Sequence, residues 1–342
     1  MEGFILPERS QLIGELMAEG GRDGDALSLP DLCAIRAAHT RIARFIHRTP
    51  IMTCRSLDDA AGAKLFFKCE NFQKVGAFKA RGACNAVFAL PDDAARRGVV
   101  THSSGNHGAA LAYAARCRGV PAYVVMPANA AKIKQANVAG FGATVRVCAP
   151  TMAAREWLCA EVARETGAVL IHPYDNVEVI AGQGTATLEM VEDVPDLDIV
   201  MAPVGGGGLL SGTAIAATSA RPGIVVYGAE PAAADDAKRG FASGSLEPLL
   251  HSSTMADGLR ATLSARTLHA LRTCVTSIAT ASEEGIASAM RLTWERMKII
   301  IEPSSAVPLA CLLERTLDVA GKRVGIILTG GNVDLDALPW QH

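Results

Sequence analysis

The sequence predicts an α/β protein with two interleaved lobes and twisted, mostly parallel sheets. Short, continuous apolar runs such as DIVMAPV, GIVVYGAE and RVGIILTGG recur along the chain, which is typical of strands buried on both faces. Helical stretches such as TMAAREWLCAEVARETG separate these runs, and this alternation indicates a parallel sheet covered by helices. A chain of 342 residues is also long enough to form two lobes.

The elements are predicted in chain order. A helical pattern over residues 29–47 stops at Thr49-Pro50, because proline disfavours a continuing helix. LFFKCE then predicts a strand and RGACNAVFAL a helix, while GVVTH predicts the next strand and HGAALAYAARCRG a helix that ends on Gly119. EVIAGQGTATLEMVED predicts another helix, and the remaining strands are predicted in PAYVVMP, ATVRVCAP, AVLIHP, DIVMAPV, GIVVYGAE and RVGIILTGG.

We expect these elements to form two domains. Residues 1–27, which end in a GGRDGD stretch, are interpreted as an N-terminal extension. Residues 97–171 are assigned to a small domain, and residues 28–96 together with 172–342 to a large domain. Ligands of such sheets bind beyond the carboxyl ends of the strands, so the loops at those ends are the candidate site.

Composition argues against several classes of partner. The formal net charge is -2 and aromatic residues make up 5% of the chain, which gives no indication of a nucleic-acid surface. No apolar run approaches the roughly 20 residues that cross a bilayer. Nine cysteines occur without a CxxC pair, which is typical of buried thiols in a reducing compartment. We therefore expect a cytoplasmic protein that binds neither nucleic acid nor membrane.

A glycine loop is the first candidate binding element. Gly205 to Gly208 follow an apolar strand and precede a helix, so several backbone N–H groups and the positive end of the helix can meet a phosphate. The dinucleotide pattern GxGxxG fails, because its last position falls on Leu210 or Ser211. The alternative is a flexible turn that allows close helix–strand packing.

A polar loop and a lysine complete the pattern. Residues 103–107, SSGNH, precede another helix and suit a carboxylate, although an ordinary helix cap is the alternative. Lys79 lies in a run with few charges, and a poorly solvated lysine loses its charge easily and can form a Schiff base. A phosphate cradle together with such an amine fits pyridoxal 5′-phosphate (PLP). A buried lysine paired with Glu70 or Asp92 is the alternative.

The motifs AFKARGA, HSSGNHG, PVGGGG, GAEPAAADD, MKIIIEPSSAVPLA and LTGGNVD occur in this order. The ordered set resembles the motifs of fold-type II PLP enzymes (tryptophan synthase β-like), and within them the serine/threonine dehydratase and serine racemase family. The resemblance runs from about Leu29 to the C-terminus. The ending, IEPSSAVPLA with NVDLDALPW, looks most like β-hydroxyaspartate dehydratases.

The resemblance implies a role for each matching residue. Lys79 would attach the cofactor and move the Cα proton, Phe78 would pack on the ring, and Asn106 would hydrogen-bond the ring hydroxyl. The remaining cofactor contacts would be Gly205, Gly206, Gly207, Gly208 and Leu209 at the phosphate and Thr329 at the pyridine nitrogen. The substrate carboxylate would lie against Ser103, Ser104, Gly105 and His107. A divalent cation (Mg²⁺, Mn²⁺ or Ca²⁺) would be bound by Glu230, the carbonyl of Ala234 and Asp236.

Individual positions refine this picture. Ser104 is serine in the racemases, where it protonates Cα from the face opposite the lysine, so it is a second catalytic candidate. Arg155 falls near the substrate cleft of the racemases and could pair with a second carboxylate; an exposed arginine beside Glu156 is the alternative. Tyr174 stands where the racemases have asparagine, and Glu302 matches the region of their nucleotide site.

The implied activity is that of an ammonia-lyase. It would convert a β-hydroxy amino acid, with 3-hydroxyaspartate preferred, to a 2-oxo acid (oxaloacetate) and ammonia by α,β-elimination of water. The neutral hydroxyl of Thr329 makes the ring a weaker electron sink than an aspartate would, which favours elimination over transamination. Serine/threonine dehydratase, phenylserine dehydratase and serine racemase are the alternatives, and a silent amino-acid-binding protein is the non-enzyme alternative. A homodimer is expected from the family.

Overall fold

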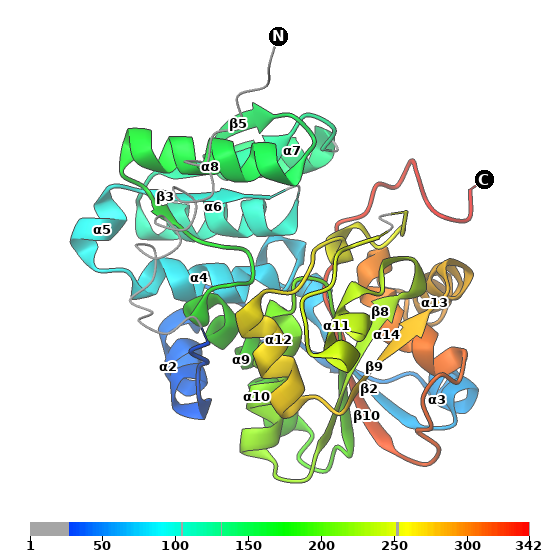
Figure 1. The fold of residues 1–342 in the computed structure, drawn as a ribbon. Helices are drawn as coiled ribbons and strands as arrows, with labels where there is room; N and C mark the ends of the chain where they lie inside the picture. The colour runs from blue at the N-terminus through cyan, green and yellow to red at the C-terminus, as the bar shows by residue number, and fades with distance from the viewer. Residues whose placement is uncertain (1–26, 104, 131, 251–252, 342) are drawn as a thin grey trace.

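A computed structural model describes residues 27–341 except 104, 131 and 251–252. Two sheets form its framework (Figure 1). Every strand pair is parallel except β1 with β2, so the predicted mostly parallel α/β fold is confirmed. The six-stranded sheet has the order β1 (Ile51–Met52), β2 (Lys64–Cys69), β10 (Arg323–Leu328), β7 (Ile199–Pro203), β8 (Val225–Pro231) and β9 (Ser277–Ala281). The four-stranded sheet has the order β5 (Thr144–Cys148), β4 (Ala122–Pro127), β3 (Val99–His102) and β6 (Val169–Leu170).

Helices cover both sheets. On the four-stranded sheet, α6 and α8 contact β3 and β4; on the six-stranded sheet, α10 contacts β7 and β8, and α14 contacts β7 to β10. The helices are α2 (Leu32–Ile42), α3 (Arg55–Ala61), α4 (Lys79–Ala89), α5 (Asp92–Arg96), α6 (Asn106–Arg118), α7 (Lys132–Gly140), α8 (Met152–Thr166), α9 (Val177–Asp193), α10 (Gly208–Ala220), α11 (Asp236–Ser243), α12 (Ala265–Cys274), α13 (Glu283–Met297) and α14 (Pro303–Leu313). Short 3₁₀ turns are η1 (Glu70–Phe72), η2 (Lys74–Gly76), η3 (Ala232–Ala234) and η4 (Asp257–Leu259).

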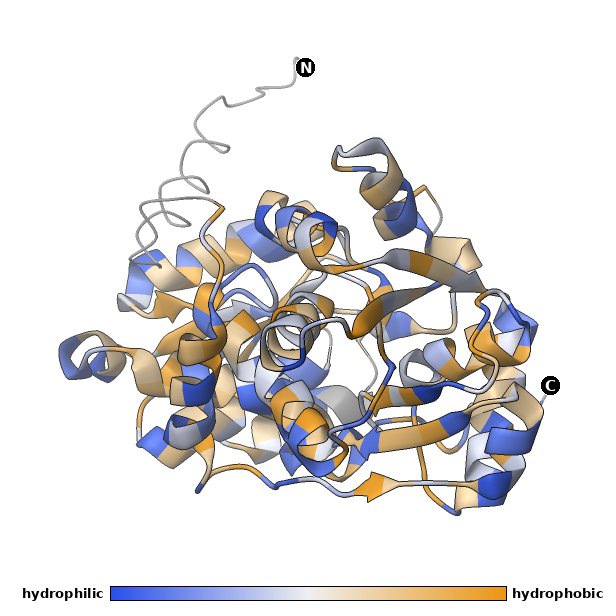
Figure 2. Ribbon diagram, turned by 90° about the horizontal axis from the view of Figure 1, so that it is seen from below, coloured by the Kyte–Doolittle hydropathy of each residue, from blue (hydrophilic) through white to orange (hydrophobic). Residues whose placement is uncertain are grey.

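Strand β7 shows why the apolar runs form central strands. All five of its residues are buried. Met201 packs in one core cluster with residues of α13 and α14, whereas Val200 and Ala202 pack in another with residues of α10. Because successive side chains of a strand point to opposite faces, a strand covered on both sides has to be apolar throughout. Figure 2 shows this as orange colouring along the strands of the sheets.

Glycines bring α4, α9 and α10 unusually close together. A Cβ atom added to Gly182 on α9 would lie 2.6 Å from the Cα of Gly82 on α4. A Cβ atom on Gly184 would lie 2.9 Å from the carbonyl oxygen of Gly212 on α10. Side chains at these positions would push the helices apart. This packing fixes α4, the helix that begins at Lys79.

The structure departs from the sequence prediction in a few elements. The first helix, α2, covers only residues 32–42 of the predicted 29–47, because the chain turns before it reaches Pro50. The strands β1 and β9 were not predicted. Of the predicted extension, residues 1–26 lie outside the described part of the chain, and the domain boundaries at 96–97 and 171–172 stay a prediction. Within the described residues, no helix is long and apolar enough to cross a membrane.

Candidate active site

A cleft of about 170 Å³ lies where the ends of strands from both sheets meet. The loops after β3, β7 and β10 contribute to its wall, as does the first turn of α4. Ser104 lies outside the described residues, so its predicted role stays a prediction. The other predicted cofactor and substrate residues all line the cleft: Phe78, Lys79, Ser103, Gly105, Asn106, His107, Arg155, Gly205, Gly206, Gly207, Gly208, Leu209 and Thr329.

Lys79 is the first residue of α4, and its position is fixed by the neighbouring loop. The backbone N–H of Phe78 donates to the carbonyl of Thr329 at 2.9 Å. The Lys79 ammonium nitrogen Nζ donates to the carbonyl of Pro173 at 2.8 Å. Burial lowers the pKa of Lys79 to about 8, so roughly a tenth of this amine is uncharged and nucleophilic at about pH 7, far more than for an ordinary lysine.

The alternative of a structural ion pair for Lys79 is wrong. Glu70 binds Arg81, with Nε to Oε2 at 2.7 Å, and Asp92 binds Arg118, with Nη2 to Oδ1 at 2.8 Å. Neither carboxylate is therefore the partner of Lys79. The amine is held by a carbonyl oxygen, which does not stabilise a full positive charge as a carboxylate would.

The glycine loop has no room for side chains. Gly207 has a φ of +87°, a left-handed conformation that favours glycine. A Cβ atom on Gly205 would lie 2.9 Å from the Cα of Leu259, and Cβ atoms on Gly206 and Gly208 would meet Tyr174. The loop leads into α10, whose first N–H groups have no acceptor within the helix. This buried turn with converging N–H groups fits a phosphate.

The polar loop at the start of α6 can meet a carboxylate through its backbone N–H groups rather than through its histidine ring. Ser103 Oγ accepts from the N–H of Gly105 at 3.1 Å, and His107 Nε2 lies 3.3 Å from the carbonyl of Ile171. Burial, together with the charge of Lys79, lowers the pKa of His107 to about 3. A neutral ring has a single N–H, which the Ile171 carbonyl takes. His107 can therefore meet a carboxylate through its backbone N–H, not through its ring.

Glu302 is a site residue that sequence reasoning assigned elsewhere. It is buried and precedes α14, and its two oxygens accept from the Asn106 side-chain amide at 2.9 and 3.2 Å. Asn332 in turn donates to Asn106 Oδ1 at 2.9 Å. This series of hydrogen bonds from Asn332 through Asn106 to Glu302 fixes the orientation of the Asn106 amide. At the far wall, Thr329 Oγ1 lies 2.9 Å from Ser305 Oγ, so its hydroxyl is held in place.

The cleft has further residues to which the sequence assigned no role in the site. His102 at the end of β3 has its pKa lowered to about 4 by burial and by the charge of Arg155, so its ring is neutral. Tyr174 packs on His172, with ring centroids 4.6 Å apart. The remaining ones include Met152, Asp257, Arg260 and Ser304. His102 and Ser304 lie within the motifs HSSGNHG and MKIIIEPSSAVPLA. For the segment with Arg260, the Asp257-Gly258 dipeptide, which is typical of a turn, is a signal that could have drawn attention to it.

The predicted cation site lies apart from the lining of the cleft, at the start of α11. The Glu230 oxygens accept from the N–H groups of Ala237 and Lys238, both at 2.9 Å. Asp236 is 2% exposed, and neither of its oxygens has a hydrogen-bond partner. Burial raises the pKa of Glu230 to about 8 and that of Asp236 to about 6. Among the described residues no group of three His, Cys, Asp or Glu could hold a metal, so a cation here would also need carbonyl or water ligands.

The chain is similar to known pyridoxal-phosphate-dependent enzymes. The family model described as pyridoxal-phosphate dependent enzyme matches residues 42–330. A β-hydroxyaspartate dehydratase of Paracoccus denitrificans is 51% identical over 305 residues, which are 89% of this chain and 97% of the relative. A serine racemase of Dictyostelium discoideum is 48% identical, over 89% of this chain and 95% of the relative. The structure of maize serine racemase superposes with a TM-score of 0.88 at 45% identity, covering 90% of this chain and 95% of that one.

Proposed function

Because the chain belongs to the fold-type II pyridoxal-phosphate-dependent enzymes, in the group of dehydratases and serine racemases, we propose that it is a 3-hydroxyaspartate ammonia-lyase. It would eliminate water from the substrate and yield oxaloacetate and ammonia. The relative named as a β-hydroxyaspartate dehydratase supports this substrate. A relative of similar identity is named as a serine racemase, so the names of the relatives do not decide the substrate. The residues of the cleft have to decide it.

The substrate proposal rests on the unpaired side chain of Arg155 in the cleft. It begins the second turn of α8 and lines the cleft. Its Nε is buried without a hydrogen-bond partner, and among the described residues it forms no ion pair, not even with the neighbouring Glu156. A guanidinium left unpaired in a cleft is suited to a carboxylate of the ligand. 3-Hydroxyaspartate has a second carboxylate, whereas serine and threonine do not.

The proposed mechanism divides the work among the residues of the cleft. PLP, when bound, withdraws electrons from Cα and so acidifies its proton. Backbone N–H groups at the start of α6 hold the α-carboxylate, and the uncharged Lys79 amine takes the Cα proton. The hydroxyl of Thr329 would keep the pyridine end of the site neutral, which favours loss of the β-hydroxyl over transamination. The β-hydroxyl would depart as water, and the proton that it takes up balances the one removed from Cα. The glycine loop would hold the phosphate of the cofactor near Lys79.

The first test is the initial rate of ammonia release from a panel of hydroxy amino acids. We expect one stereoisomer of 3-hydroxyaspartate to react at least tenfold faster than L-serine, L-threonine or phenylserine, measured as kcat/KM. Arg155→Gln should raise KM for hydroxyaspartate by roughly ten- to a hundredfold, because one charge-assisted contact is lost, and leave serine turnover within about twofold.

Arg164→Gln on the same helix is the matched control, because Arg164 is exposed and pairs with Glu161. It should leave both substrates unaffected. Preference for serine, or racemisation of serine without ammonia, would keep the PLP chemistry and reject hydroxyaspartate as the substrate.

A divalent cation is proposed at Glu230, Asp236 and the carbonyl of Ala234. The buried Asp236 oxygens without partners support this, since a buried carboxylate normally finds a donor or a metal. Mg²⁺, Mn²⁺ or Ca²⁺ should raise the melting temperature of the wild-type protein by several degrees. Asp236→Asn should remove that gain, whereas Asp235→Asn should keep it, because the half-buried Asp235 pairs with Arg239. An equal gain in Asp236→Asn would contradict the site.

A further inference from the structure

Two arginines reach the cleft from different layers of the molecule. Arg155 lies on α8, which packs on β3 and β4 of the four-stranded sheet. Arg260 follows η4, a turn fixed to α14 by a hydrogen bond from the N–H of Gly258 to Ser304 Oγ at 3.2 Å. Leu259 of the same turn belongs to the core beneath the six-stranded sheet. Both arginines line the cleft, so they face one ligand space from its two walls.

The guanidinium of Arg260 is held by the protein backbone. Its Nε donates to the carbonyl of Thr254 at 3.0 Å, and its Nη2 donates to the same oxygen. Thr254 itself is fully buried, which makes this oxygen a fixed anchor. A guanidinium has five N–H groups, so three remain for a ligand.

The charge of Arg260 is not neutralised by the described part of the protein. Among the described residues Arg260 forms no ion pair, and its hydrogen bonds go to the neutral carbonyl of Thr254. Arg260 is exposed toward solvent, so it is reachable by a ligand. An anchored cation at the wall of a cleft attracts an anionic group at little cost in side-chain entropy.

We infer that Arg260 binds the distal carboxylate of a dicarboxylic amino acid, opposite Arg155. A carboxylate has two oxygens with about four lone-pair sites, so it can accept from two guanidinium groups at once. The α-carboxylate is accounted for by the backbone N–H groups of α6, and the phosphate of the cofactor by the glycine loop. The inference rests on the proposed function for the identity of the substrate, but it concerns a different residue and predicts a different observable.

The test uses the PLP-loaded enzyme and amino acids without a β-leaving group. L- and D-aspartate are titrated against L- and D-alanine, and binding is followed by the change in cofactor absorbance. Wild type should bind one aspartate enantiomer more tightly than the matching alanine. Arg260→Gln should weaken aspartate binding roughly tenfold or more and change alanine binding less than about twofold. Arg260→Lys should recover part of the loss, because it restores the charge without the fork.

Arg291→Gln is the control, because Arg291 is exposed on α13 and pairs with Glu295, away from the cleft lining. Unchanged aspartate affinity in Arg260→Gln, with a loss in Arg155→Gln, would overturn the role of Arg260 and leave the proposed function intact. Wild-type binding of aspartate no tighter than that of alanine would also overturn it. A wild type that selects aspartate but releases no ammonia from hydroxyaspartate would reject the proposed function and keep Arg260 as a carboxylate contact.

Discussion

Lys79→Ala is expected to abolish ammonia release, with a fall in kcat of roughly a thousandfold or more, because the variant loses both the attachment point and the base. The protein should still fold, since the Lys79 side chain makes a single hydrogen bond, to Pro173. The glycine loop should still retain PLP without a covalent bond. The absorbance of the protein-bound cofactor should shift from that of a Schiff base to that of the free aldehyde.

Lys74→Ala is the matched control, because Lys74 lies in η2 just before α4 and does not line the cleft. It should keep both the absorbance and the activity of wild type. A Lys79→Ala variant with wild-type absorbance and turnover would show that another amine attaches the cofactor.

The lowered pKa of Lys79 adds a pH dependence to this prediction. With a pKa of about 8, about a quarter of the amine is uncharged at about pH 7.5, against about one part in a thousand for an ordinary lysine. Only the uncharged amine attacks an aldehyde. The rate at which the cofactor-free protein captures PLP should therefore rise with pH and level off above about pH 8. A rate that keeps rising toward pH 10 would contradict the lowered pKa.

The sequence predicted the framework of the site but not its whole wall. The strands β7, β8 and β10 are recognisable because both of their faces are buried, which leaves a continuous apolar run. Strand β9 was missed because its sequence, SIATA, mixes small polar residues with apolar ones. The two-residue strand β1 is too short to have a pattern.

The same distinction holds for the cleft. Lys79, the glycine loop and the loop at residues 103–107 each follow a strand or begin a helix, so their chemistry is local and can be predicted. Arg260 and Glu302 reach the site only through tertiary packing, because the turn before Arg260 docks on α14 and Glu302 faces Asn106 across the cleft. Their neighbours in sequence gave no indication of this. Contacts between distant segments depend on how the layers pack, which local patterns do not determine.

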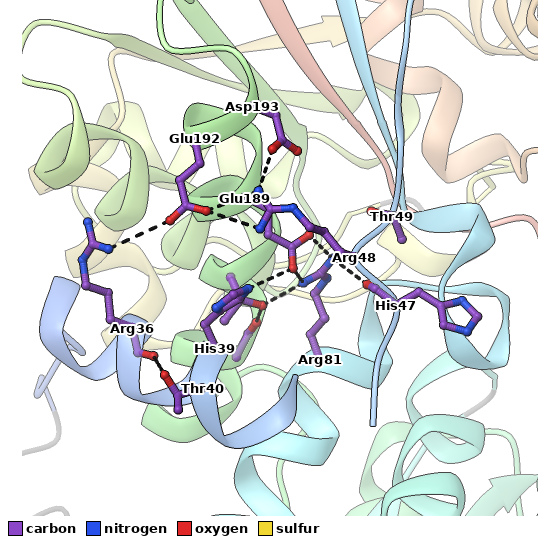
Figure 3. Close-up of polar contacts among 12 residues, drawn as sticks. Arg36, His39, Thr40, His47, Arg48, Thr49, Arg81, Glu189, Glu192 and Asp193 are labelled. Carbon is purple, nitrogen blue, oxygen red and sulfur yellow. Dashed lines mark hydrogen bonds and ion pairs between the residues drawn. The ribbon is translucent and has the colours of Figure 1, made fainter. Parts of the chain in front are cut away.

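A buried ion network beside the site is expected to have the second large effect, which is on the stability of the fold. Figure 3 shows three of its members, Arg81, Glu189 and His39. Arg81 on α4 is fully buried. It donates to Glu70 at 2.7 and 2.8 Å and to Glu189 on α9 at 2.8 Å through each Nη. Lys68 donates to Glu189 at 2.6 Å, and His39 Nε2 lies 3.3 Å from Glu189. The two cations Lys68 and Arg81 thus balance two carboxylates.

The pKa values of Arg81 and Glu189 show that their charges are compensated, whereas burial outweighs Glu189 at Lys68 and lowers the pKa of that amine. Burial alone would lower the pKa of Arg81, but Glu70 and Glu189 outweigh it and raise the pKa. Burial alone would raise the pKa of Glu189, yet hydrogen bonds from His39 and Arg81 hold it well below its usual range. A carboxylate with a lowered pKa stabilises the fold above its ordinary pKa and loses that contribution as the pH falls toward the folded value. The stabilising contribution of Glu189 should therefore be lost in acid.

Arg81→Met is expected to lower the free energy of unfolding by about 3–5 kcal/mol, because it leaves Glu70 and Glu189 buried with Lys68 as the one fully buried cation of this network. Denaturant unfolding measures this loss. Arg291→Met, which breaks the exposed pair with Glu295, should change the free energy of unfolding far less, because solvent screens an exposed ion pair. Since α4 begins at Lys79, two residues before Arg81, the variant should also bind PLP more weakly at temperatures where it is still folded. If both variants lost the same free energy of unfolding, the buried charges would not be a stabilising network. The position of Lys79 would then depend on the glycine contacts among α4, α9 and α10.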